Sequence, residues 1–183
     1  MSKAVLISIR PKWCEKIISG QKTIEVRKTR PKMDTPFKCY IYCTMDHPYI
    51  SVSCGELDKL NYRTNTVGRC NGKVIGEFIC DRIYELAPLN RAPDDVEQQA
   101  CLTREEIVLY LKGVGYGWHI SNLKIYDTPK ELIEFHTWKK CKSCNKSGYE
   151  STACIYDENC IIPAAITKAQ QSWCYVEEKL WND

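Results

Sequence analysis

Residues 5–28 read VLISIRPKWCEKIISGQKTIEVRK, and this stretch carries most of the information about the fold. Val5, Ile7 and Ile9 occupy alternate positions, which is the period-2 pattern of a β-strand. Pro11 then predicts the start of a helix, because its missing N–H costs nothing in the first turn. Gly20 predicts the end of that helix as a C-terminal cap. Residues 22–28 alternate again and predict a second strand.

The second strand has one apolar face and one charged face. Ile24 and Val26 point to one side, whereas Glu25 and Arg27 point to the other. A carboxylate accepts hydrogen bonds from an exocyclic amine, and a guanidinium donates in a fork to a phosphate or a base carbonyl. The pair therefore predicts a donor and an acceptor that read the edge of a base. The alternative is a structural ion pair on the surface, of modest energetic value.

The rest of the chain predicts a small protein with many short strands and a few short helices. A capping box at Thr103 and Glu106 predicts a helix whose apolar face carries Ile107, Tyr110 and Leu111. Another short helix is expected from Thr128–Pro129 to Phe135. Residues 45–68 and 87–101 read as loops, Asn71-Gly72 as a tight turn and Gly76 as a bulge. The remaining strands are expected at 37–44, 73–86, 122–127 and 170–178.

Size and charge limit the classes of function. The chain has 183 residues, which suits a single domain, and its net charge of +3 excludes a protein that grips duplex DNA by charge alone. A local basic patch remains compatible with that charge. No apolar stretch approaches the ~18 residues of a membrane span, and the apolar run 4–7 is too short for a signal peptide. We therefore expect a cytoplasmic protein with no membrane partner.

Gly20, Lys22, Glu25 and Arg27 form the string G-x-K-x-x-E-x-R between the predicted helix and strand. With this string in that place, residues 5–28 resemble the signature of the ASCH family. The segments 73–78, 115–135 and 170–177 also resemble ASCH-type proteins of bacteria and phages. The resemblance covers most of the chain except 45–65 and a cysteine-rich stretch. It implies one PUA-like domain over residues 1–183, α+β and mostly β, in which a β-barrel carries short flanking helices.

The resemblance also implies a polar cleft beside the first helix. ASCH domains are thought to bind RNA, as PUA relatives do, so we expect a module that recognises a base or nucleotide, including a modified one. The partner would be RNA, another single-stranded nucleic acid or a modified nucleoside. The residues expected to bind it are Ser8, Lys12, Lys22, Glu25, Arg27 and Trp118. Trp118 would be a stacking platform, with core packing as the alternative reading.

Two other functions remain open. One bacterial branch is similar but hydrolyses N4-acetylcytidine with a Lys, a Thr and a Glu. Lys22 matches the lysine, whereas Glu25 stands where that branch has threonine, which disfavours an amidohydrolase with Lys22 and Glu25 as catalytic residues. The third residue is left open among four candidates, Glu77, Glu85, Glu105 and Glu106. The other alternative is a protein-interaction module that uses the lysine-rich segment near residue 140.

Four of the twelve cysteines lie within twenty residues: Cys141, Cys144, Cys154 and Cys160. The Cys-x2-Cys spacing is that of a zinc knuckle, and four thiolates complete a tetrahedral structural site. His136 is a substitute fourth ligand, and nearby lysines favour thiolates. We therefore expect residues 136–163 to form an insertion held by structural zinc. The alternative is free cysteines or disulfides formed on oxidation.

Overall fold

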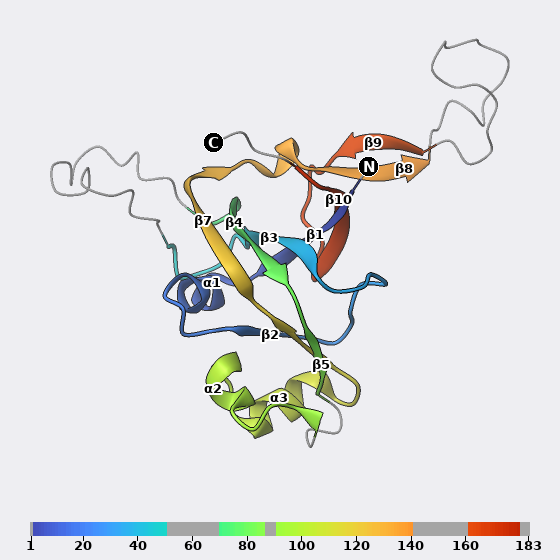
Figure 1. Ribbon diagram of the computed structural model, residues 1–183. Coiled ribbons are helices and arrows are strands. Elements are labelled where there is room, and N and C mark those ends of the chain that lie inside the picture. Colours follow the sequence, from blue (N-terminus) through green and yellow to red (C-terminus); the bar gives the residue numbers. More distant parts are fainter. Residues whose placement is uncertain (1, 51–69, 87–90, 141–160, 180–183) are drawn as a thin grey trace, which may run out of the picture.

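The structure is a computed structural model that describes residues 2–50, 70–86, 91–140 and 161–179 (Figure 1). Its described strands are β1 (Lys3–Ile9), β2 (Ile24–Arg27), β3 (Phe37–Cys43), β4 (Val74–Cys80), β5 (Ile83–Glu85), β6 (Tyr116–His119), β7 (Ser121–Lys130), β8 (His136–Lys140), β9 (Ile161–Ala165) and β10 (Trp173–Glu177). The helices are α1 (Pro11–Ile18), α2 (Val96–Ala100), α3 (Arg104–Leu111) and the 3₁₀ turn η3 (Leu132–Glu134).

The largest sheet is mixed and has the order β10-β1-β3-β4-β7. β1 and β3 are parallel, with Val5 opposite Cys39, and the other neighbours are antiparallel. A parallel neighbour requires a crossover connection, and the chain makes it through α1 and β2. The second sheet has the order β2-β6-β5, and β8 pairs with β9. In Figure 1 the β8–β9 hairpin and the helices α2 and α3 lie at opposite ends of the view.

β1 is buried on both faces because each face packs in a core of its own. Val5, Ile7 and Ile9 pack in one core together with the buried side of α1. Ala4 and Leu6 point the other way and pack in a second core. Burial on both faces is typical of strands with a parallel neighbour. The same packing holds the end of β1, from which α1 departs, in place.

A third core covers the apolar face of β2. Ile24 and Val26 pack against Val96, Ile107 and Leu111 from α2 and α3. Because successive side chains of a strand point to opposite faces, Glu25 and Arg27 are directed away from these helices. The charged face of β2 is thereby placed beside α1.

Several local predictions are confirmed. The first helix begins at Pro11, and Gly20 follows its end with φ +73°. The capping box of Thr103 and Glu106 is present at the start of α3. The pairing of β3 with β4 shifts register next to Gly76, and a Cβ atom at Gly76 would collide with the carbonyl oxygen of Lys124 on β7. The absence of a Cβ atom at Gly76 therefore lets β4 and β7 approach closely.

Other expectations need correction. The class, α+β and mostly β, is confirmed, but the described strands form three hydrogen-bonded sheets and no closed barrel. The long strand expected at 73–86 bends at Asp81–Arg82 and divides into β4 and β5, which belong to different sheets. Residues 96–100, expected as loop, form α2, which is too short for a helical pattern to be visible.

The helix expected from Thr128 to Phe135 is also wrong. β7 continues through Pro129 to Lys130, which pairs with Val74 of β4, and only the 3₁₀ turn η3 follows. Sheet pairing overrides the local preference of proline for a helix start. None of the helices in the described ranges is long and apolar enough to span a membrane.

Candidate functional site

A cleft of about 1050 Å³ opens beside α1 and the charged face of β2. Segments distant in sequence build it: the junction of β1 and α1, β2 with the two residues after it, the chain after β3, the end of α3, and residues 168–172. Its lining includes Ser8, Trp13, Lys22, Glu25, Arg27, Thr44, Asp46, Tyr110 and Lys168.

Three charged side chains form a network in the wall of this cleft. Lys22, Glu25 and Arg27 are 2%, 5% and 8% exposed. Lys22 Nζ lies 3.4 Å from Glu25 Oε2, and Arg27 Nη2 lies 3.1 Å from Glu25 Oε1. Lys22 also donates to the carbonyl oxygen of Ala100 at 2.7 Å, and Arg27 to that of Ser8 at 2.6 Å. The network is therefore anchored at both ends to the backbone.

This network contradicts the alternative of a surface ion pair, because its members are shielded from bulk water. The predicted sharing of one strand face by Glu25 and Arg27 is observed. Glu25 Oε2, Arg27 Nε and Thr44 Oγ1 are buried and have no hydrogen-bond partner among the described residues. Each such atom costs about 1–3 kcal/mol, so the wall of the cleft keeps unused hydrogen-bonding capacity.

Ser8 and Lys12 differ in their relation to the cleft. Ser8 lines it, but its hydroxyl donates to the carbonyl oxygen of Gln170 at 2.6 Å, which joins β1 to the segment 168–172. Lys12 is exposed and does not line the cleft; its Nζ lies 4.6 Å from the ring centroid of Trp13. We assign Ser8 a positioning role, whereas Lys12 lies at the edge of the site.

Trp118 is not a stacking platform. Its side chain is 0% exposed and packs against Phe37 and Trp173, with ring centroids 5.9 Å and 6.0 Å away. Trp118 is the cross-strand partner of Glu25 on β6, the middle strand of its sheet. A position between two paired strands and beneath the large sheet leaves no face of the ring open to a ligand, so the alternative reading as a core residue is correct.

Two aromatic residues of the cleft escaped the sequence analysis. Trp13 was not singled out from the sequence, yet it lines the cleft, and Lys22 Nζ lies 5.1 Å from its ring centroid. Tyr110 was expected on the apolar face of α3, but it is 44% exposed and lines the cleft, whereas Ile107 and Leu111 are buried. Helical spacing alone does not distinguish a residue in the core from one at the edge of a cleft.

The third residue of the related hydrolases is not found beside Lys22 at any of the positions considered for it. None of the four glutamates considered for the third position lines the cleft. Glu77, for example, lies 3.4 Å from Lys38 Nζ and accepts a hydrogen bond from Tyr126 at 2.6 Å. The other acidic residue in the lining is Asp46.

A cysteine nucleophile is also disfavoured at this site. Cys14, on the buried side of α1, is 0% exposed. Burial raises the pKa of its thiol well above the ordinary value, and Cys43 and the charge of Glu25 add to the effect. Since the thiolate is the reactive form, Cys14 is a packing residue.

The predicted zinc ligands, Cys141, Cys144, Cys154 and Cys160, lie outside the described residues. Within the ranges that the structure describes, no group of three or more His, Cys, Asp or Glu residues is arranged to hold a metal ion. His136 starts β8, and four residues of strand place it about 13 Å from Lys140. The role of His136 as a substitute ligand stays a prediction, since the four cysteines lie outside the described residues.

No family model and no curated protein matches the chain. Three crystal structures of one protein from Zymomonas mobilis match in fold. This chain is similar in structure to ASCH proteins. An ASCH mutant protein matches with 18% identity and TM-score 0.49, over 72% of this chain and 77% of its own.

The other two ASCH structures are slightly less similar. The first, ASCH without a substitution in its name, has 19% identity and TM-score 0.47 over 70% of this chain and 73% of its own. The second, another ASCH mutant, has 19% identity and TM-score 0.42 over 69% and 70%. ASCH is the family that residues 5–28 resemble. Because a shared fold does not determine function, evidence for the function has to come from the cleft.

Proposed function

We propose that the cleft binds a base or nucleotide of RNA or another single-stranded nucleic acid, and that the protein is a binding module. The observation that supports this most is the buried Lys22–Glu25–Arg27 network in the wall of the cleft. Buried charges are costly unless paired. A paired network that is held by backbone carbonyls and lies in the wall of a cleft is suited to recognise a polar ligand.

The hydrogen-bonding groups suit the edge of a base. Glu25 Oε2 is an acceptor whose described contact is the ion pair with Lys22 Nζ at 3.4 Å, and Arg27 Nε is a donor without a hydrogen-bond partner among the described residues. Base edges present donors and acceptors side by side, and charged side chains read them with charge-assisted hydrogen bonds. Thr44 adds a hydroxyl that can donate or accept.

Trp13 supplies the apolar part of the proposed site. Its ring lines the cleft on the side of α1, close to Lys22 Nζ. Stacking of a base on an aromatic ring contributes about 1–3 kcal/mol and tolerates any base. In this arrangement, stacking on Trp13 of α1 would supply affinity for any base. Hydrogen bonds from Glu25 and Arg27 of β2 would supply the selectivity among bases.

The test is calorimetric titration with the four nucleoside 5′-monophosphates and with N4-acetylcytidine, followed by product analysis. We expect Glu25→Gln to weaken the preferred nucleotide about tenfold to a hundredfold, since a hydrogen bond to a charged group contributes about 1.5–3 kcal/mol. Arg27→Lys removes the planar fork and should also weaken binding. The matched control is Glu85→Gln, an exposed carboxylate paired with Arg91.

Binding that is equal in Glu25→Gln, Arg27→Lys and wild type would overturn the proposal. Release of cytidine from N4-acetylcytidine, lost in Lys22→Ala, would favour the amidohydrolase instead. Absence of nucleotide binding together with an RNA-independent protein partner would favour the interaction module.

A further inference from the structure

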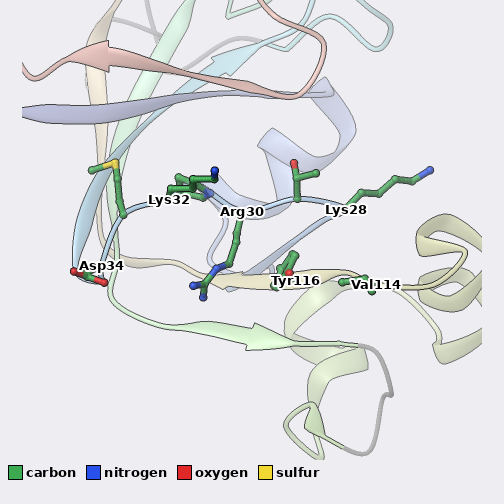
Figure 2. Close-up of a pocket in the computed structure, with 9 residues that line it drawn as sticks. Lys28, Arg30, Lys32, Asp34, Val114 and Tyr116 are labelled. Carbon is green, nitrogen blue, oxygen red and sulfur yellow. The ribbon is translucent and has the colours of Figure 1, made fainter.

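A second hollow of about 560 Å³ adjoins the cleft and is basic. It is formed by the loop between β2 and β3, with Val114 and Tyr116 opposite. Figure 2 shows Lys28, Arg30 and Lys32 following one another along this loop, with Arg30 reaching toward the strand that carries Tyr116. Lys28 and Thr29 line both the hollow and the cleft. The two depressions are therefore neighbours at the end of β2.

The three cations of this loop are available to a ligand. Lys28, Arg30 and Lys32 are exposed. None of them forms an ion pair with any residue in the described part of the chain. They occupy alternate positions of the loop that follows β2. Exposed cations that follow one another along an open depression are suited to a linear polyanion.

The loop is held in place by β10. Thr29 Oγ1 accepts a hydrogen bond from Trp173 Nε1 at 3.0 Å, and the Lys32 backbone N–H donates to the Tyr175 hydroxyl at 2.7 Å. These two anchors flank Arg30, so the backbone is fixed while the cationic ends stay exposed. A surface ordered in advance loses less entropy on binding.

Aromatic rings accompany the cations. Lys28 Nζ lies 5.3 Å from the ring centroid of Tyr110, and Arg30 Cζ lies 5.9 Å from that of Tyr116. Both distances fall within the range of cation–π contacts. Cations interleaved with aromatic rings are the combination with which proteins hold single-stranded nucleic acid, by phosphate contacts and base stacking.

We propose that the basic hollow is a second subsite, which holds the phosphodiester backbone next to the base in the cleft. The inference rests on the proposed function and deepens it: the ligand is a single-stranded oligonucleotide and not a free nucleoside. The strand leaves the cleft past Lys28 and follows Arg30 and Lys32. Ribo- and deoxyribonucleotide strands share this chemistry, so the experiment compares them.

The experiment measures binding of nucleoside 5′-monophosphates and of fluorescent pentanucleotides of A, C and U by anisotropy, with the DNA forms in parallel. Titrations at several salt concentrations between about 50 and 200 mM give the salt dependence. The test variant is Arg30→Gln/Lys32→Gln. The matched control is Lys3→Gln/Lys139→Gln, which removes two exposed cations that line neither depression.

The wild type should bind pentanucleotides more tightly than mononucleotides. In the test variant, the slope of log K against log salt should shrink by about 1.4, because each phosphate contact to a single strand contributes about 0.7. Its mononucleotide affinity should stay at the wild-type value. The control should keep both the slope and the affinities of the wild type.

Other outcomes separate the two proposals. Mononucleotide binding with no gain for pentanucleotides, or an unchanged slope in the test variant, would overturn the second subsite alone. Pentanucleotide binding that needs Arg30 and Lys32 but is unaffected by Glu25→Gln would overturn base recognition in the cleft and support the second subsite in the basic hollow. Failure of the wild type to bind any of these probes would overturn both.

Discussion

Glu25 lies between two cations at a position where none of the three charges meets bulk water. Removing a charge from water costs several kcal/mol, and a partner of opposite sign offsets that cost. The carboxylate is thus what allows Lys22 and Arg27 to be buried in the wall of the cleft. The residue that we propose reads the ligand also stabilises the fold.

We predict that Glu25→Ala lowers the free energy of unfolding by about 3–5 kcal/mol, because it leaves two buried cations without their shared partner. Urea denaturation measures this change. Glu85→Ala is the control: Glu85 pairs with Arg91 on the surface, and its loss should cost about 1 kcal/mol or less. A loss for Glu25→Ala no larger than for Glu85→Ala would contradict the buried network.

Among the elements, α3 connects the third core to the cleft. Ile107 and Leu111 pack against β2, and Tyr110 on the same helix lines the cleft. The start of the helix is fixed by reciprocal hydrogen bonds: the Glu106 N–H donates to Thr103 Oγ1 at 3.2 Å, and the Thr103 N–H donates to Glu106 Oε2 at 2.8 Å. A helix this short depends on its cap and its packing.

Thr103→Ala should therefore reduce the free energy of unfolding by about 1 kcal/mol, the typical cost of losing an N-cap side chain. Thermal or urea denaturation provides the measurement. Leu109→Ala, which truncates an exposed side chain on the same helix, is expected to have a smaller effect. Equal stability of Thr103→Ala and the wild type would show that packing alone holds α3.

Elements were predictable where their signals are local. Pro11, Gly20 and the capping box act within one turn of helix, so the bounds of α1 and the start of α3 follow from neighbouring residues. In the sequence, β4 and β5 look like one strand. The bend at Asp81–Arg82 separates them because β4 pairs with β7 in one sheet and β5 pairs with β6 in another, and neither pairing is visible in the local sequence. Pro129 likewise signals a helix start that the pairing of β7 overrides.

At the scale of the molecule, the described cysteines are thiols in packed surroundings. None of the seven forms a disulfide with another described cysteine, and five are buried. Burial raises the pKa of Cys80 to about 12 and that of Cys174 to about 11. Such thiols are inert packing residues, in contrast to the four cysteines for which we propose zinc.

We predict that the purified protein contains one zinc ion per chain, since four thiolates complete a tetrahedral structural site. Elemental mass spectrometry measures the metal. Cys141→Ser/Cys144→Ser should lose it, whereas Cys101→Ser/Cys174→Ser, which changes two partly exposed cysteines of the described fold, should retain it. Metal-free wild-type protein, prepared with zinc present, would contradict the prediction.

Alternation along residues 22–28 was sufficient to place Glu25 and Arg27 on one face of a strand, because side-chain direction in a strand depends on the backbone alone. Whether that face meets water depends on what packs beside it. The hydrogen bond from Ser8 Oγ to the carbonyl oxygen of Gln170 spans 162 positions of the chain. Contacts of that range assemble the cleft, and they decide that Trp118 is buried and Tyr110 exposed. No local sequence pattern encodes these contacts, because they depend on the pairing of strands far apart in sequence.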